Sequence, residues 1–411
     1  MEVTEKINVT NKKLKRFNNI YPWFDAISCD LLFFMAIDTL FFTIVKGFNP
    51  AQIAMLTTIS SIITIIMQVP LVNLIKRLGN TKSVRFGTFV LLISACLITF
   101  SPNYIGVAIG RVLYELSFIF ERMVAISLKN NLIYQNRADD YKKMLNKGYT
   151  IYAAITLIIA FISGPIFNIN NYLPMYLCII VCVIGFIMSF EMFDISEIHK
   201  LENDEEEQRK SKRSKIPIII IFILISYTLV YGLIINGQAN SKLLIQYDLA
   251  ENFEVTTVAM YLSMIVVVSR MARLFTNLIF EKIYNKFVKK FHIFIAVMLV
   301  LSFALVVCGH FIVEPLTFKF TIMAAGFCII LMVRDPFRIF MQDLVLSNTK
   351  HSEQQLVFAY MELGRKIGTA GISILITAML TKLSLVYVII LMLTLAIAHC
   401  LVARKLYKLI K

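Results

Sequence analysis

Charged side chains interrupt the apolar segment 332–343, MVRDPFRIFMQD. Arg334 and Arg338 are four residues apart, so a helix would place both guanidinium groups on one face. Asp335 can reach Arg338 from three residues away, and Pro336 removes a backbone donor and favours a bend. Two cations on one apolar face need an anion, which is either internal or a carboxylate or phosphate group of a substrate. The segment is therefore a candidate substrate site or a candidate gate.

The internal alternative has three candidate anions, which are Asp335, Glu362 and Asp30. In that case the two arginines hold a gate closed and do not bind a solute. Arg365 extends the polar stretch that contains Glu362, SNTKHSEQQLVFAYMELGRKIG. We expect Asp335, Glu362 and Arg365 to belong to a gate or interface, and both roles of the arginines remain open.

A second set of charged side chains lies in the first half of the chain. Asp30 occurs in the apolar segment 20–46, and Arg111 and Glu115 occur in the segment 103–127. Arg111 and Glu115 are four residues apart, so an internal salt bridge is one interpretation. In the other interpretation Asp30 or Glu115 exchanges a proton, as carboxylates in membrane-embedded proton relays do. The three residues are candidates for substrate binding or proton coupling.

The composition places the chain in a membrane. Its 411 residues are 58% hydrophobic and 16% charged, and the mean hydropathy is +0.74. Soluble domains are about 45–50% apolar and about 25% charged. The net charge of +15 does not indicate a nucleic-acid partner, because the basic residues lie in short loops between apolar segments. Without a catalytic, nucleotide-binding or CxxC motif, the sequence predicts neither an enzyme nor a cofactor nor a metal site.

Apolar runs of about twenty residues recur along the whole chain, which is the pattern of membrane-spanning helices. We predict an all-α integral membrane protein with twelve transmembrane helices. Their approximate ranges are 20–46, 51–75, 84–102, 103–127, 148–169, 171–194, 216–239, 254–281, 291–312, 316–345, 357–381 and 383–403.

The charge of the loops predicts the orientation. The loops after the second, fourth, sixth and eighth spans and both chain ends are rich in Lys and Arg, whereas the loops SPNY, NINNYLP and HFIVEPL contain neither. The positive-inside rule then places both termini in the cytoplasm, which an even number of spans allows. Glu121 and Arg122 would lie at the cytoplasmic end of the fourth span, where we expect gate or interface salt bridges.

An acidic block followed by a basic block separates the sixth span from the seventh and predicts a solvated linker. The chain then divides into two six-helix bundles. The predicted parts are a cytoplasmic N-terminal tail, an N-terminal bundle, a cytoplasmic linker, a C-terminal bundle and a cytoplasmic C-terminal tail, at 1–19, 20–194, 195–215, 216–403 and 404–411.

The two predicted halves repeat a basic loop after their second span, NLIKRLGNTKSVRFG and KIYNKFVKKFHIF. The chain resembles the major facilitator superfamily, whose signature in this loop is roughly G-x-L-x-D-R-x-G-R-[RK]. Arg77 and Gly79 match it, whereas Lys76 stands at the acidic position and Asn80 and Thr81 replace basic residues. The resemblance implies two pseudo-symmetric bundles, with Lys76, Arg77 and Gly79 at the interface that gates transport.

The sequence therefore predicts a secondary transporter of a small organic solute that works by alternating access and is coupled to protons. Export is favoured over uptake. We expect a monomer in a bacterial plasma membrane, in contact with protons, lipids and a small-molecule substrate. Two alternatives on the same fold are a lipid flippase or scramblase and a non-transporting sensor or immunity protein.

Overall fold

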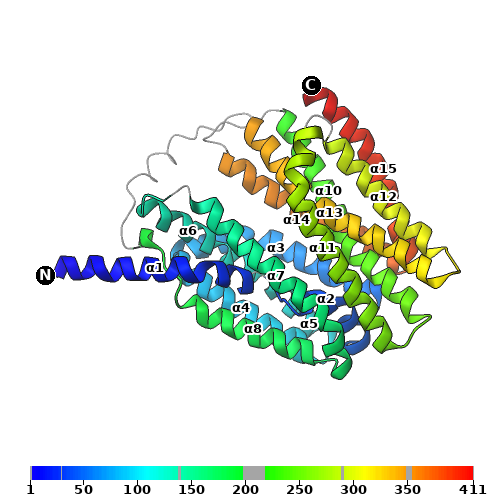
Figure 1. Ribbon diagram of the computed structural model, residues 1–411, viewed down its shortest axis with the longest axis horizontal. Helices are drawn as coiled ribbons and strands as arrows, with labels where there is room; N and C mark the ends of the chain where they lie inside the picture. The colour runs from blue at the N-terminus through cyan, green and yellow to red at the C-terminus, as the bar shows by residue number, and fades with distance from the viewer. Residues whose placement is uncertain are drawn as a thin grey trace. The chain divides into compact units, whose positions relative to one another are not determined.

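The computed structural model describes residues 2–28, 30–137, 140–197, 218–287, 291–348 and 354–410. Every secondary-structure element in these ranges is a helix, so the predicted all-helical architecture is confirmed (Figure 1). Nine of the described helices are long and apolar enough to cross a membrane, and the segments Phe34–Val45 and Leu173–Ser189 are shorter apolar helices. Each of the twelve predicted spans corresponds to one described helix or to successive ones.

The chain forms two compact units, which we call unit 1 and unit 2. Unit 1 comprises Met1–Asp38 and Ile66–Asp204, and unit 2 comprises Thr39–Ile65 and Glu205–Lys411. The helices α2 (Phe34–Leu40) and α3 (Pro50–Leu78) both run across the boundary in sequence.

Unit 1 is built around α4, which packs against α5 and α8, while α1 packs against α7 and α8 (Figure 1). Aromatic side chains of α1 at helical spacing, Phe17, Tyr21 and Phe24, form a buried core with residues of α6. Besides parts of α2 and α3, this unit contains α1 (Glu2–Ser28), α4 (Asn80–Phe100), α5 (Tyr104–Glu121), α6 (Met123–Tyr134), α7 (Asp140–Ile169), α8 (Leu173–Ser189) and η2 (Ile195–Glu197).

In unit 2, α10 packs against α13, α14 and α15, and α13 also packs against α11 and α12. Gly368 allows a close approach between α10 and α14, because a Cβ there would lie 1.9 Å from the carbonyl oxygen of Thr228. The helices of this unit are η1 (Phe41–Val45), α10 (Ile218–Ala250), α11 (Val255–Phe287), α12 (Phe291–His310), α13 (Leu316–Asn348), α14 (Gln354–Leu380) and α15 (Leu385–Ile410).

Two predicted spans are not single helices. The first was expected to be continuous over 20–46, but α1 ends at Ser28, residues 30–33 are not helical, and α2 begins at Phe34. The fourth is divided at Arg122, between α5 and α6. By contrast, α13 remains helical through Pro336, so the proline does not interrupt the tenth span.

Several predicted features fall outside the described part of the chain. Most of the expected linker 195–215 does, since description stops at residue 197 and resumes at residue 218. Residues 288–290 of the second basic loop and the side chain of Glu362 also lie outside it.

Candidate substrate and proton sites

Asp30 lies at the break in the first span and is bonded on two sides. Its Oδ1 accepts a hydrogen bond from the backbone N–H of Leu31 at 2.8 Å and another from the hydroxyl of Tyr114 in α5. An aspartate that accepts from nearby backbone donors competes with the helix for them, which favours a break at this position. The non-helical segment therefore presents a carboxylate to α5.

Arg111 occupies the centre of a charged cluster in unit 1. Its guanidinium lies 4.5 Å from the centroid of the Tyr114 ring, and its Nη2 lies 3.9 Å from Oε1 of Glu115. Asp30 and Asp38 also act on it electrostatically. Three carboxylates and one phenol thus act on one guanidinium, and we call these five residues the acidic cluster.

The structure brings together the three residues predicted for proton coupling, Asp30, Arg111 and Glu115. Sequence reasoning did not select Tyr114, which links Asp30 to Arg111. The spacing in the sequence could have identified Tyr114, because it lies three residues after Arg111 and therefore on the same helix face. The thiol of Cys182 in α8 is a further electrostatic neighbour of Asp30.

Glu121 is buried at the end of α5, with 7% of its surface exposed. The hydroxyl of Ser28 donates to its Oε1 at 3.2 Å, and Asp25 and Arg122 act on it electrostatically. Asp25 in turn lies against α7, since a Cβ added to Gly148 would approach its Oδ2 to 2.6 Å. Within unit 1, Glu121 thus joins α5 to α1.

The loop between α3 and α4 carries the predicted interface residues Lys76, Arg77 and Gly79. Lys76 and Arg77 are exposed in the last turn of α3. Gly79 has a φ of 80°, a left-handed conformation that side chains with a Cβ disfavour. The backbone N–H of Thr81, in the first turn of α4, donates to Oε1 of Glu197 at 2.8 Å. An acid from the segment after α8 therefore caps α4.

A second acid of that segment, Asp194, is 1% exposed and accepts hydrogen bonds from several elements. The side-chain amide of Asn80 donates to its Oδ2 at 2.7 Å and the hydroxyl of Ser127 at 3.0 Å. Asn130 and Ser196 donate as well. The signature of the major facilitator superfamily has an acidic residue in this loop, at the position of Lys76 in this chain. Here two acids from a distant part of the sequence, Asp194 and Glu197, bind to the loop instead. Sequence reasoning missed both, because neither is near the loop along the chain.

Three arginines of unit 2 gather around Tyr231 of α10, and we call this group the arginine cluster. Arg334 and Arg338 of α13 and Arg365 of α14 all act electrostatically on the Tyr231 hydroxyl, to which Arg334 also donates a hydrogen bond. The guanidinium of Arg365 lies 5.5 Å from the centroid of the ring. Nη1 of Arg334 also donates to Oε1 of Gln238 at 3.4 Å. The structure thus places Arg365, predicted as a gate residue, beside the two predicted substrate arginines.

Asp335 forms a bidentate salt bridge with Arg273 of α11. Nε of Arg273 lies 2.6 Å from Oδ2, and Nη2 lies 2.9 Å from Oδ1. Both carboxylate oxygens of Asp335 therefore face α11.

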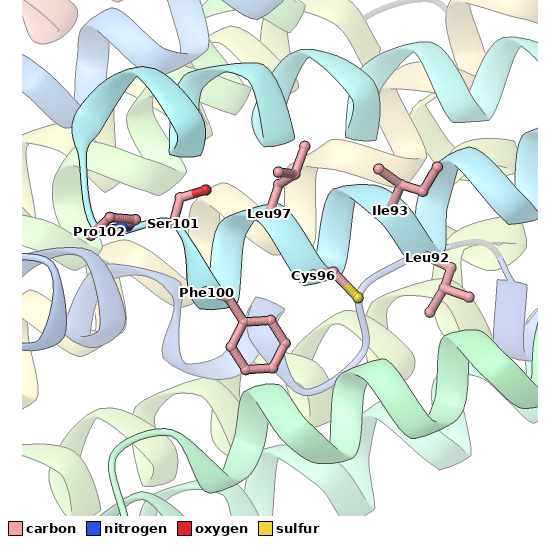
Figure 2. A pocket seen from close by; sticks show the side chains of 7 residues that line it. All are labelled: Leu92, Ile93, Cys96, Leu97, Phe100, Ser101 and Pro102. Atoms are coloured by element: carbon pink, nitrogen blue, oxygen red, sulfur yellow. The ribbon is translucent and has the colours of Figure 1, made fainter.

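A surface hollow with a volume of about 550 Å³ lies along the C-terminal half of α4 (Figure 2). Its lining is mostly apolar and comprises Leu92, Ile93, Cys96, Leu97, Phe100, Ser101 and Pro102. None of these seven side chains is charged. Within the described ranges there is also no group of three or more His, Cys, Asp or Glu side chains able to hold a metal ion.

The sequence profile of the Major Facilitator Superfamily matches residues 26–370. The chain belongs to this family, and the predicted fold class is confirmed. No curated protein sequence matches the chain.

Solved structures support the same fold. One is the crystal structure of the nucleoside transporter NupG, with a TM-score of 0.72 and 12% identity over 96% of this chain and 99% of that one. Another is a bacterial homologue of the iron transporter ferroportin in an inward-facing state, with a TM-score of 0.70 and 12% identity over 95% and 98%. A bacterial metal transporter has a TM-score of 0.65 and 11% identity over 95% and 98%. At such identities these similarities establish the fold alone.

Proposed function

We propose that this secondary transporter couples the movement of a small organic solute to protons through the acidic cluster. The observation that carries the proposal is the gathering of Asp30, Asp38 and Glu115 around Arg111. An ionised carboxylate inside a membrane protein is costly, and carboxylates that act on the same guanidinium also repel one another. A proton that binds to one of them lowers both costs, and its release restores them.

The position of Asp30 supports its role as the coupling residue. A carboxylate at a helix break can exchange its hydrogen-bond partners through a change in the backbone as well as in the side chain, because residues at the ends of helices absorb changes in φ and ψ. Tyr114 bonds to Asp30 and lies against Arg111. Protonation of Asp30 therefore alters a contact that reaches the guanidinium, which links the proton to the geometry of the cluster.

The positive-inside pattern of the sequence supports a bacterial plasma membrane location with both termini in the cytoplasm. Export, which the sequence favours over uptake, stays a prediction. The monomeric state is also a prediction. Assays from both sides of an oriented membrane would establish the direction.

The test uses the full chain in proteoliposomes that contain an internal pH indicator. Solutes are added as a panel that includes inorganic phosphate, succinate, glucose and tetraphenylphosphonium. We expect the double variant Asp30→Asn with Glu115→Gln to lower solute-induced proton movement by about tenfold or more, the effect of losing roughly 1.4 kcal/mol from the coupled step.

The matched control is Asp140→Asn, since Asp140 pairs with Arg137 on the exposed surface of unit 1. It makes the same chemical change away from the acidic cluster and should retain proton movement. Full proton movement in the double variant would contradict the proposal. Movement of a fluorescent lipid without any response to solutes would favour the flippase alternative instead.

A further inference from the structure

A buried amide oxygen near the end of α10 accepts no hydrogen bond. Gln246 is 4% exposed, and its Nε2 donates to Oγ1 of Thr43 in η1. Among the residues that the structure describes, none donates to Oε1 of Gln246. Leaving a buried acceptor without a donor lowers the stability of a fold. An atom of this kind is therefore a candidate for contact with a ligand.

The hydrogen of the neighbouring threonine determines which end of the amide faces it. Oγ1 of Thr43 lies 2.8 Å from the carbonyl oxygen of Thr39 and 3.4 Å from that of Leu40, and both of these oxygens only accept. The single hydroxyl hydrogen of Thr43 is used there, so its Oγ1 must accept in the contact with Gln246. Only the NH₂ group of an amide donates, and Oε1 is consequently the atom that is directed away from Thr43.

Thr43 lies on an irregular part of the backbone. The segment η1 is a short π-helix, Phe41–Val45, that follows α2 directly. Helical segments of this kind are rare and occur frequently at functional sites. Both η1 and α10 belong to unit 2. The amide of Gln246 is thus oriented by a feature of the fold that is itself typical of a site.

We propose that Oε1 of Gln246 accepts a hydrogen bond from a hydroxyl group of the transported solute, and that Thr43 positions the amide for this contact. The inference rests on the proposed function in one respect, since it takes the hydroxyl group to belong to the solute that the protein moves. It adds the chemical class of that solute, which is a neutral hydroxylated molecule such as a sugar, a polyol or a nucleoside.

The surroundings of Gln246 favour a neutral donor over a charged one. Lys242 is one turn earlier on the same face of α10 and is also buried, at 5% exposure. Its positive charge repels a second cation in a region of low dielectric, so an ammonium group is a poor donor for this position. A hydroxyl group is neutral and donates one hydrogen bond. A buried acceptor also discriminates against analogues without the hydroxyl group, because they leave it unpaired.

The experiment measures binding without a proton gradient, so that it is independent of coupling. The full chain in discs of neutral lipid is titrated at one pH, and the unfolding temperature is recorded. The hydroxylated probes are glucose, ribose, myo-inositol and uridine. Betaine and tetramethylammonium, which have no hydrogen to donate, and methylammonium, a charged donor, serve as controls. At least one hydroxylated probe should give a saturable increase in the unfolding temperature, and no control should.

Substitutions of Gln246 separate binding from a general effect of the probes. Sugars and polyols stabilise folded proteins because they are excluded from protein surfaces, and this effect does not depend on one side chain. Gln246→Leu removes the acceptor at similar volume and should weaken binding by about tenfold. The matched control is Gln135→Leu, which removes an amide that accepts from Asn18 in unit 1. It should leave binding unchanged.

Two substitutions of Thr43 test its role in positioning the amide. Thr43→Ser keeps the hydroxyl group and should retain binding. Thr43→Val keeps the shape of the side chain without the hydroxyl group and should weaken binding by about fivefold, because one hydrogen bond that orients the amide is lost. A role in packing alone predicts the opposite order, since valine matches threonine in shape more closely than serine does.

Thr43→Val keeps the proposal falsifiable even if Gln246→Leu does not fold. The inference is overturned if no hydroxylated probe gives a saturable shift, which would leave Oε1 with a bound water only. It is also overturned if binding is unchanged in both Gln246→Leu and Thr43→Val. Stabilisation by methylammonium equal to that by the hydroxylated probes would overturn the class of solute that we propose.

Failure of this inference is separable from failure of proton coupling. Binding that depends on Gln246, in a protein that moves no protons, would leave the hydroxyl site standing and contradict the coupling proposal. Proton movement driven by glucose and fully retained in Gln246→Leu would contradict the hydroxyl site and leave the coupling standing.

Discussion

In unit 1 three carboxylates act electrostatically on the guanidinium of Arg111, whereas in unit 2 three guanidinium groups act on the phenol of Tyr231. The two halves of the family fold share a layout of helices but place opposite charge in the clusters that we describe. A carboxylate can take up a proton or pair with a cation, whereas a guanidinium pairs with an anion. The similarity of the halves therefore says little about which chemistry each performs.

The units also differ in how they hold their other buried acids. Asp194 of unit 1 is bonded by amide and hydroxyl donors, which are neutral. Asp248 of unit 2 lies 3.0 Å from Nζ of Lys319 and 3.0 Å from Nδ1 of His310. Both Asp248 and Lys319 are buried, at 2% and 8% exposure. Unit 2 thus neutralises this acid with a cation, and unit 1 stabilises its acid with dipoles.

The largest expected effect is the loss of the buried ion pair of unit 2. Asp248→Asn would leave Lys319 as a buried cation, which costs about 3–5 kcal/mol of unfolding free energy. Thermal and denaturant unfolding in lipid discs would measure this loss. The double variant Asp248→Asn with Lys319→Met removes the stranded charge and should recover most of the stability. A single variant within about 1 kcal/mol of the unchanged protein would show that Asp248 does not neutralise a buried charge.

A smaller effect is expected for the corresponding change in unit 1. Asp194→Asn keeps one acceptor oxygen and strands no opposite charge, so the loss should be about 2 kcal/mol, from weakened hydrogen bonds to Asn80 and Ser127. The same unfolding measurements apply. A loss equal to that of Asp248→Asn would remove the distinction that we draw between the two units.

The smallest expected effect is the difference in stability between alanine variants of Gly79 and Gly47. Both glycines have a left-handed backbone, with φ angles of 80° and 66°. Alanine is strained at both. A Cβ at Gly79 would also lie 2.7 Å from Oε1 of Glu197, whereas one at Gly47 meets nothing within 4 Å. We expect Gly79→Ala to be the more destabilising by about 1 kcal/mol, because it displaces the acid that caps α4.

Hydrogen exchange at the Thr81 amide provides a second measurement of that cap. Its exchange should accelerate in Gly79→Ala and stay unchanged in Gly47→Ala. Equal destabilisation by the two substitutions, with Thr81 still protected, would indicate that Glu197 moves aside at no cost.

Much of the fold could be predicted from the apolar runs, since a helix is the structure that satisfies the backbone of an isolated span. The break at Asp30 could not. The segment 29–33 contains neither proline nor glycine, and the hydroxyl that bonds to Asp30 belongs to Tyr114, 84 residues away. At Pro336, where the sequence favours a bend, the helix continues.

The amino-acid sequence is sufficient to predict that the chain spans a membrane, that it consists of helices and that charged residues interrupt the first, fourth and tenth spans. These properties follow from side-chain polarity and periodicity within a short segment. The partners of the charged residues, such as Arg273 for Asp335 and Glu197 for the loop at Gly79, are known from the folded structure. Each partner comes from a separate helix or segment, and the position of a charge along one helix does not specify which neighbour packs against it.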